Sequence, residues 1–112
     1  MKESILLSIK KMLGMPADYT HFDLDIITHI NTVLMGLTQI GVGPSEGFII
    51  EDDSTSWSDY IADPLKLQAV KTYIYLKVRL IFDPPQSSSH MEAIKQSISE
   101  YEWRLNVAVD PS

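Results

Sequence analysis

The sequence predicts a small all-α domain, a fold class that three observations indicate. Of the 112 residues, 45% are hydrophobic and 21% are charged, as in an ordinary globular domain. Apolar residues recur at spacings of three and four in four separate segments, the pattern of helices that each bury one face. Glycine and proline residues separate several of these segments. We therefore expect one helical domain over residues 1–112, with four main helices and one short helical turn.

The first two main helices are predicted at residues 3–13 and 23–40. Lys10 suits the negative end of the first helix dipole, and Gly14 can supply a left-handed cap. Asp23 places negative charge at the start of the second helix. The apolar residues expected to face the core are Ile5, Leu6, Ile9, Met12 and Leu13 in the first helix, and Leu24, Ile26, Ile27, Ile30, Val33, Leu34, Leu37 and Ile40 in the second.

Residues 41–55 are predicted to form a long loop. Glycine and proline break the helical pattern, the run Phe48–Ile50 allows a short strand or hairpin, and the acidic triplet Glu51–Asp53 follows. Loops of this length inside a small compact domain usually have a function. This loop is therefore the first place to look for one.

A short helical turn at 57–61 and a long helix at 64–82 come next. Ser56 or Thr55 can cap the turn, and Asp63 before Pro64 is a typical helix start. The inner face of the long helix is expected to hold Leu67, Val70, Tyr73, Ile74, Val78 and Ile81.

The last main helix is predicted at residues 89–106. Pro84 and Pro85 end the preceding helix, and Ser89 with Glu92 matches a capping box. An extended apolar tail should then run over residues 106–112. The predicted inner seam of the last helix is Met91, Ile94, Ile98, Tyr101 and Leu105.

Composition excludes several classes of function. The absence of cysteine excludes disulfides and thiol catalysis, and the formal charge of −6 argues against clamping DNA by its phosphates. The sequence has neither an apolar run long enough to span a bilayer nor a signal-peptide pattern, so we expect no membrane association and no export.

We expect no catalytic residues, no metal and no cofactor. The best candidate for metal ligands is the series His21, Asp25 and His29, spaced four apart. Asp25 is already accounted for by its place at the start of a helix, where negative charge is favourable, and no further segment supplies the ligands that would complete a coordination shell. Gly41, Gly43 and Gly47 lack the Gly-Lys-Ser/Thr ending of a phosphate-binding loop.

Two surface features indicate contacts with other proteins. Lys71, Tyr75 and Arg79 fall on one helical face, which we interpret as solvated or paired with another subunit. Trp103 lies off the seam of the last helix beside Arg104, and exposed aromatics and arginines are typical of interfaces.

Taken in order, these segments resemble the head-tail connector, or adaptor, family of tailed phages. The resemblance covers nearly the whole chain and depends on helix order and scattered residues. The residues that carry it are Lys10 to Gly14, the helix from Asp23 to Ile40 with Gly41 after it, Asp63 and Pro64, Leu80 to Pro85, and Glu102 to Val107.

The resemblance implies a structural virion protein of viral or prophage origin, without enzymatic activity. Its copies would form a ring, typically twelve-fold, below the portal protein and above a stopper or tail-completion protein. Double-stranded DNA would pass through the ring without sequence-specific binding. The protein would reside at the head-tail interface of the virion, and in the host cytoplasm during assembly.

The resemblance also suggests sites. The residues implied for the channel-lining loop are Gly43, Glu46, Phe48, Glu51, Asp52 and Asp53. Those implied for binding the portal or another partner are Trp103, Arg104, Leu105, Asn106, Val107 and Val109. A ring also needs two complementary faces, for which Lys71, Tyr75 and Arg79 on one side and Asp59 and Asp63 on the other are candidates.

Two other hypotheses remain open. A small helical regulatory module could hold a partner peptide between its helices without forming a ring. An enzyme ranks third, because it depends only on the segment from His21 to His29.

Overall fold

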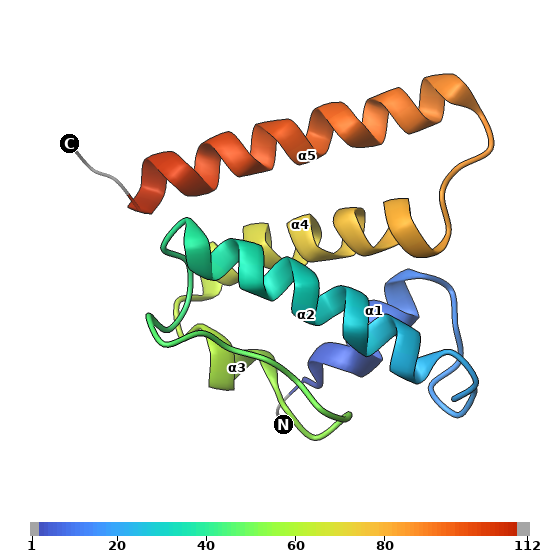
Figure 1. Ribbon diagram of the computed structural model, residues 1–112, viewed down its shortest axis with the longest axis horizontal. Coiled ribbons are helices and arrows are strands. Elements are labelled where there is room, and N and C mark those ends of the chain that lie inside the picture. The colour runs from blue at the N-terminus through green and yellow to red at the C-terminus, as the bar shows by residue number, and fades with distance from the viewer. Residues whose placement is uncertain (1–2, 110–112) are drawn as a thin grey trace.

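The computed structural model describes residues 3–109 and confirms the all-α fold (Figure 1). Within this range the chain has four longer helices and one short helix, as predicted. Their bounds are α1 Ile5–Met12, α2 Asp23–Gln39, α3 Trp57–Tyr60, α4 Pro64–Phe82 and α5 Ser88–Val109.

Helix α4 lies at the centre of the fold. It packs against α2 on one side and against α5 on the other, so α2 and α5 occupy opposite sides of α4 (Figure 1). Phe22, just before α2, packs edge-on against Phe82 at the end of α4, which shows that the two helices run antiparallel. The loop of residues 83–87 reverses the chain, so α4 and α5 are antiparallel as well (Figure 1).

The core lies mainly between these helices and uses most of the predicted stripes. On α2 the buried residues are Ile26, Ile30, Val33, Leu34 and Leu37, all of them predicted. Leu24, Ile81 and Met12 were expected to be buried and are instead exposed. Each lies in the first or last turn of its helix, where fewer neighbouring residues cover a side chain.

Helix α1 is joined to the segment before α3 by backbone hydrogen bonds. The amide of Ile5 donates to the carbonyl of Thr55, and the amide of Trp57 donates to the carbonyl of Glu3. These bonds form an isolated antiparallel bridge between Ser4 and Ser56. Two segments about 50 residues apart in the sequence are thereby fastened together.

The predicted strand or hairpin at Phe48–Ile50 is absent from the described chain. The segment runs beside α2, where Asn31 both donates to the carbonyl of Ile50 (2.9 Å) and accepts from its amide (2.8 Å). A side-chain amide therefore satisfies the backbone groups of Ile50 that a partner strand would otherwise pair.

The last helix starts one residue before its predicted bound and ends three residues after it, and its predicted capping serine was wrong. The amide of His90 donates to the hydroxyl of Ser87, so Ser87 caps α5 and Ser89 lies inside it. The helix continues to Val109, so residues 106–109 are helical and not extended. β-Branched residues lower helix propensity by only some tenths of a kcal/mol, and proline does not occur until Pro111. Residues 110–112 of the predicted tail lie outside the described chain.

Lys10 has a role that the sequence did not indicate. Its side chain is fully buried, and its ammonium donates to the carbonyls of Ala17 (3.0 Å) and Tyr19 (2.7 Å). It also pairs with the carboxylate of Asp23 at 2.8 Å. Lys10 thus ties the turn between α1 and α2 to both helices, beyond any effect on the helix dipole.

Candidate functional site

The acidic end of the 41–55 loop is open to solvent. Glu46, Glu51, Asp52 and Asp53 are all exposed. The Ser54 hydroxyl and the Ser54 backbone amide both donate hydrogen bonds to the Asp52 carboxylate. These bonds, the hydroxyl's more than the amide's, lower the pKa of Asp52. These four predicted loop residues are therefore accessible to a partner.

The other two predicted loop residues help to build the domain. The ring of Phe48 packs against Tyr60 with centroids 4.8 Å apart. Gly43 has a positive φ of 84°, and a Cβ placed there would lie 2.5 Å from the Tyr60 ring. Gly43 is therefore required both by the backbone conformation and by the close approach of Tyr60.

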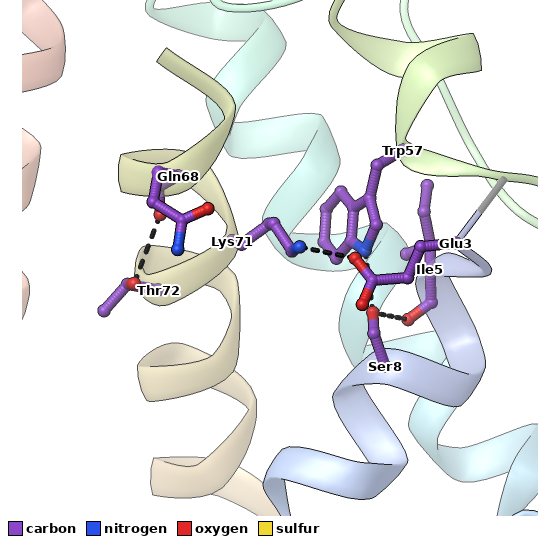
Figure 2. Close-up of polar contacts among 7 residues, drawn as sticks. All are labelled: Glu3, Ile5, Ser8, Trp57, Gln68, Lys71 and Thr72. Carbon is purple, nitrogen blue, oxygen red and sulfur yellow. Dashed lines mark hydrogen bonds and ion pairs between the residues drawn. The ribbon is translucent and has the colours of Figure 1, made fainter. Parts of the chain in front are cut away.

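The predicted basic stripe is largely occupied by contacts within the chain. Lys71 pairs with Glu3, and its ammonium lies 5.6 Å from the ring centroid of Trp57 (Figure 2). Further along the same face, the guanidinium of Arg79 donates to the hydroxyl of Tyr75 at 3.1 Å.

The predicted acidic partners of this stripe also have local roles. Asp63 caps α4 by accepting from the amide of Leu65 at 3.0 Å. Asp59 accepts from the backbone amide of Ser56 at 3.0 Å, as in a capping box. Both carboxylates thus stabilise helix starts in the isolated subunit.

Trp57 anchors the junction of α1, α3 and α4. Its indole nitrogen donates to the hydroxyl of Ser8 at 2.7 Å, and that hydroxyl donates to the carbonyl of Ile5 at 3.1 Å (Figure 2). The indole is only 2% exposed. Burial with a satisfied N–H makes Trp57 a structural residue.

The predicted partner-binding residues lie in the last turns of α5. Trp103 is 67% exposed and Val107 is 51% exposed, while Arg104 and Asn106 are exposed as well. Leu105 instead packs into the core, so it is not accessible to a partner. Val109 belongs to the last turn of α5.

A hollow that is open to solvent lies between α2 and the loop, and no pattern in the sequence indicated it. It encloses about 460 Å³ and is lined by Met35, Thr38 and Gln39 from α2 and by residues 46–49 of the loop. Met35 is 60% exposed and Ile49 is 59% exposed. The hollow therefore presents apolar side chains to solvent.

His21, Asp25 and His29 do not form a metal site in this fold. His29 lies against the ring of Phe82, with centroids 6.5 Å apart, whereas His21 packs edge-on against Phe22. No group of three metal-ligating side chains occurs among residues 3–109.

A family model described as phage connector protein matches residues 5–112, nearly the whole chain. The chain belongs to the phage connector protein family. It is therefore a structural phage protein of the head-tail connector type, from a family that is not normally enzymatic and that assembles with other head and tail proteins. The family places it in the virion. No curated protein and no solved structure matches the chain.

The described part of the connector has no helix long and apolar enough to cross a membrane.

Charge is distributed unevenly along the connector. Residues 12–65, which include α2, the loop and α3, contain no lysine or arginine. Of the nine cationic residues, six lie in residues 66–104, on α4 and α5. This asymmetry was visible in the sequence, and only the fold shows that it separates the α2 side from the α5 side. The acidic residues of 12–65 are Asp18, Asp23, Asp25, Glu46, Glu51, Asp52, Asp53, Asp59 and Asp63.

Proposed function

We propose that this connector forms a closed ring, twelve-fold in the virion, below the portal protein, and that the ring extends the DNA channel toward the tail. The observation that carries the proposal is the family match over residues 5–112. Apolar side chains exposed on two different helices support it, because copies in a ring meet through two unlike surfaces.

The acidic loop suits a channel wall. Glu46, Glu51, Asp52 and Asp53 are exposed carboxylates on one loop. Carboxylates repel the phosphates of double-stranded DNA, so DNA could slide past without sticking. We assign the channel lining to this acidic part of the loop.

We assign portal contact to the C-terminal end of α5, where Asn106 and Val107 are exposed. A downstream stopper or tail-completion protein would meet the opposite rim of the ring. Assembly would take place in the host cytoplasm, before the tail is joined.

The test is native mass spectrometry of the connector alone and mixed with portal rings of the same phage. We expect a discrete complex with about one connector per portal subunit, which is lost when residues 103–112 are removed. A connector monomer alone is compatible with the proposal, because a heterologous contact can require a template. A connector that stays monomeric in the presence of the portal would contradict it.

A second candidate function is a monomeric module that binds a partner peptide. The hollow between α2 and the loop supports this alternative, because it is apolar and open to solvent. A one-to-one complex with a tail protein, formed without any ring, would favour it.

A further inference from the structure

The side chains of Trp103 and Met35 lie on surfaces that face away from each other. Trp103 lies on the side of α5 away from the buried residues Ile98 and Leu105, so it points away from α4. Met35 lies on the side of α2 away from Ile30 and so also points outward. Because α4 lies between α2 and α5, the two outward surfaces are on opposite edges of the domain (Figure 1).

Opposite edges are the arrangement that a closed ring needs. In a twelve-fold ring each copy is rotated by about 30° from the last, so the two contact surfaces of one copy point in nearly opposite directions. A surface on α5 and a surface on α2 satisfy this condition without any change in the fold.

The two surfaces can also fit one another. The exposed Trp103 indole borders an open hollow on α5 together with Gln96 and Ser99, whereas Met35, Phe48 and Ile49 border a hollow of about 460 Å³. A cavity of about 150 Å³ holds a benzene molecule, so the hollow at Met35 has room for an indole. Tryptophan is among the residues most often found to dominate the binding energy of an interface.

One pair of opposite charges borders the two surfaces, Arg104 beside Trp103 and Glu46 at the hollow, and Glu100 also lies at the Trp103 surface. Arg104, next to Trp103, lies over the ring of Tyr101 on α5. Glu46 lines the hollow, in the half of the chain that has no lysine or arginine. Attraction between Arg104 and Glu46 would favour contact between an α5 surface and an α2 surface over contact between two α5 surfaces or two α2 surfaces.

We propose that Trp103 of one connector inserts into the hollow between α2 and the 46–49 segment of the next copy, with Arg104 facing Glu46 across the contact. The occupant of the hollow is thus a second copy of this chain. This inference rests on the proposed ring. In it Trp103 contacts the neighbouring subunit, and the last turn of α5 contacts the portal.

Cysteine cross-linking tests the contact directly, because the natural chain has no cysteine. Arg104→Cys combined with Glu46→Cys should give a ladder of covalent oligomers when rings assembled on the portal are treated with a short bismaleimide. Each single variant should give no ladder. Arg104→Cys combined with Asp25→Cys is the matched control, because Asp25 is exposed at the other end of α2.

A second measurement tests the side chain itself. We expect Trp103→Ala and Met35→Glu each to lower the amount of connector in the ring about tenfold or more at a fixed concentration. Leu24→Ala, an exposed apolar residue away from the hollow, should leave ring formation unchanged. Circular dichroism of each variant should remain native, since all three positions are exposed.

The outcomes separate this contact from the proposed function. If the natural chain forms no ring with the portal, the proposed function fails and this inference fails with it. If the ring forms but the 46/104 pair gives no ladder, only the inference is overturned. If the variant with both Glu46→Cys and Arg104→Cys gives a ladder but Trp103→Ala still forms rings normally, the role of the indole is overturned. Loss of portal binding by Trp103→Ala without a 46/104 ladder would assign Trp103 to the portal instead.

Discussion

Trp57 and Trp103 lie in two regions of the connector that are built in opposite ways. Trp57 is enclosed by α1 and α4, its N–H is bonded to Ser8, and Lys71 lies over its ring. Trp103 projects from the outer side of α5, which packs chiefly on α4. The same residue type therefore stabilises the fold where other parts of the chain surround it, and remains exposed where they do not.

The largest expected effect is at Trp57. Trp57→Ala should lower the free energy of unfolding by about 3–5 kcal/mol, because it removes a buried indole and leaves a cavity. Trp103→Ala should change it by less than about 0.5 kcal/mol, as at other exposed positions. Urea denaturation followed by circular dichroism measures both. A comparable loss in the two variants would contradict the distinction between the regions.

Removal of the buried ammonium should have the next largest effect. Lys10→Met should cost about 2–4 kcal/mol of stability, because Asp23 and two carbonyls lose a buried partner. Lys11→Met is the matched control, because Lys11 is the exposed neighbour on the same helix. Thermal unfolding of the two variants should separate them clearly. Equal melting temperatures would mean that the Lys10 contacts do not stabilise the fold.

Substitutions of Gly43 and Gly47 in the loop should also differ in their cost. Gly43→Ala should cost about 1–3 kcal/mol, because the new methyl meets Tyr60 and the positive φ is strained. Gly47→Ala has the strain but open space around its Cβ, so it should cost about 1 kcal/mol. The difference in urea midpoint measures the contact with Tyr60 alone. If Gly47→Ala costs as much, backbone strain accounts for both.

Tyr73 should control how firmly α5 is held. Its hydroxyl donates to Glu102 of α5 at 2.8 Å, so Tyr73→Phe should weaken the contact by about 1 kcal/mol. Hydrogen exchange should accelerate in α5 more than in α1. Tyr75→Phe is the comparison, because the hydroxyl of Tyr75 accepts from Arg79 within α4 itself. Uniform acceleration across the chain would show that α5 does not open separately.

The last effect appears only in alkali and is absent at neutral pH. Burial raises the pKa of Tyr60 from 10.0 to about 12, and burial with the bond to Glu102 also raises the pKa of Tyr73. The unfolded chain then loses these protons at lower pH than the folded chain, so the contribution of the two tyrosines to stability should be constant below pH 10 and fall from pH 10 to 12. Tyr60→Phe should make this fall shallower, as measured by urea midpoints between pH 9 and about 12. An unchanged slope would contradict the buried environment of Tyr60.

Most of the helices could be predicted because their signals are local. The Asp63–Pro64 start, the Ser56 cap and the apolar spacing in α2 and α4 each depend on residues close in sequence. The wrong end of α5 and the wrong capping serine arose where local signals competed. Three consecutive serines, Ser87 to Ser89, lie within one turn, and the valines near the end have only weakly unfavourable helix propensity.

The candidate surfaces could be predicted only in part. Trp103 was identified correctly as lying off the seam of its helix, because the periodicity of α5 places it there. The hollow at Met35 and Ile49 could not be found in the same way, since it forms where the loop comes to lie along α2. Nor could the sequence show that Lys71 is already paired with Glu3, a residue 68 positions away.

The sequence by itself determined the helical fold class, the approximate order and length of the helices and the uneven charge along the chain. All of these follow from spacing and composition over one or two helical turns. Only the tertiary structure decided that Lys10 is buried, that Trp57 is enclosed while Trp103 is not, and that the α2 and α5 surfaces lie on opposite edges. These properties depend on which distant segments meet, and the local physical preferences of a chain do not specify those contacts.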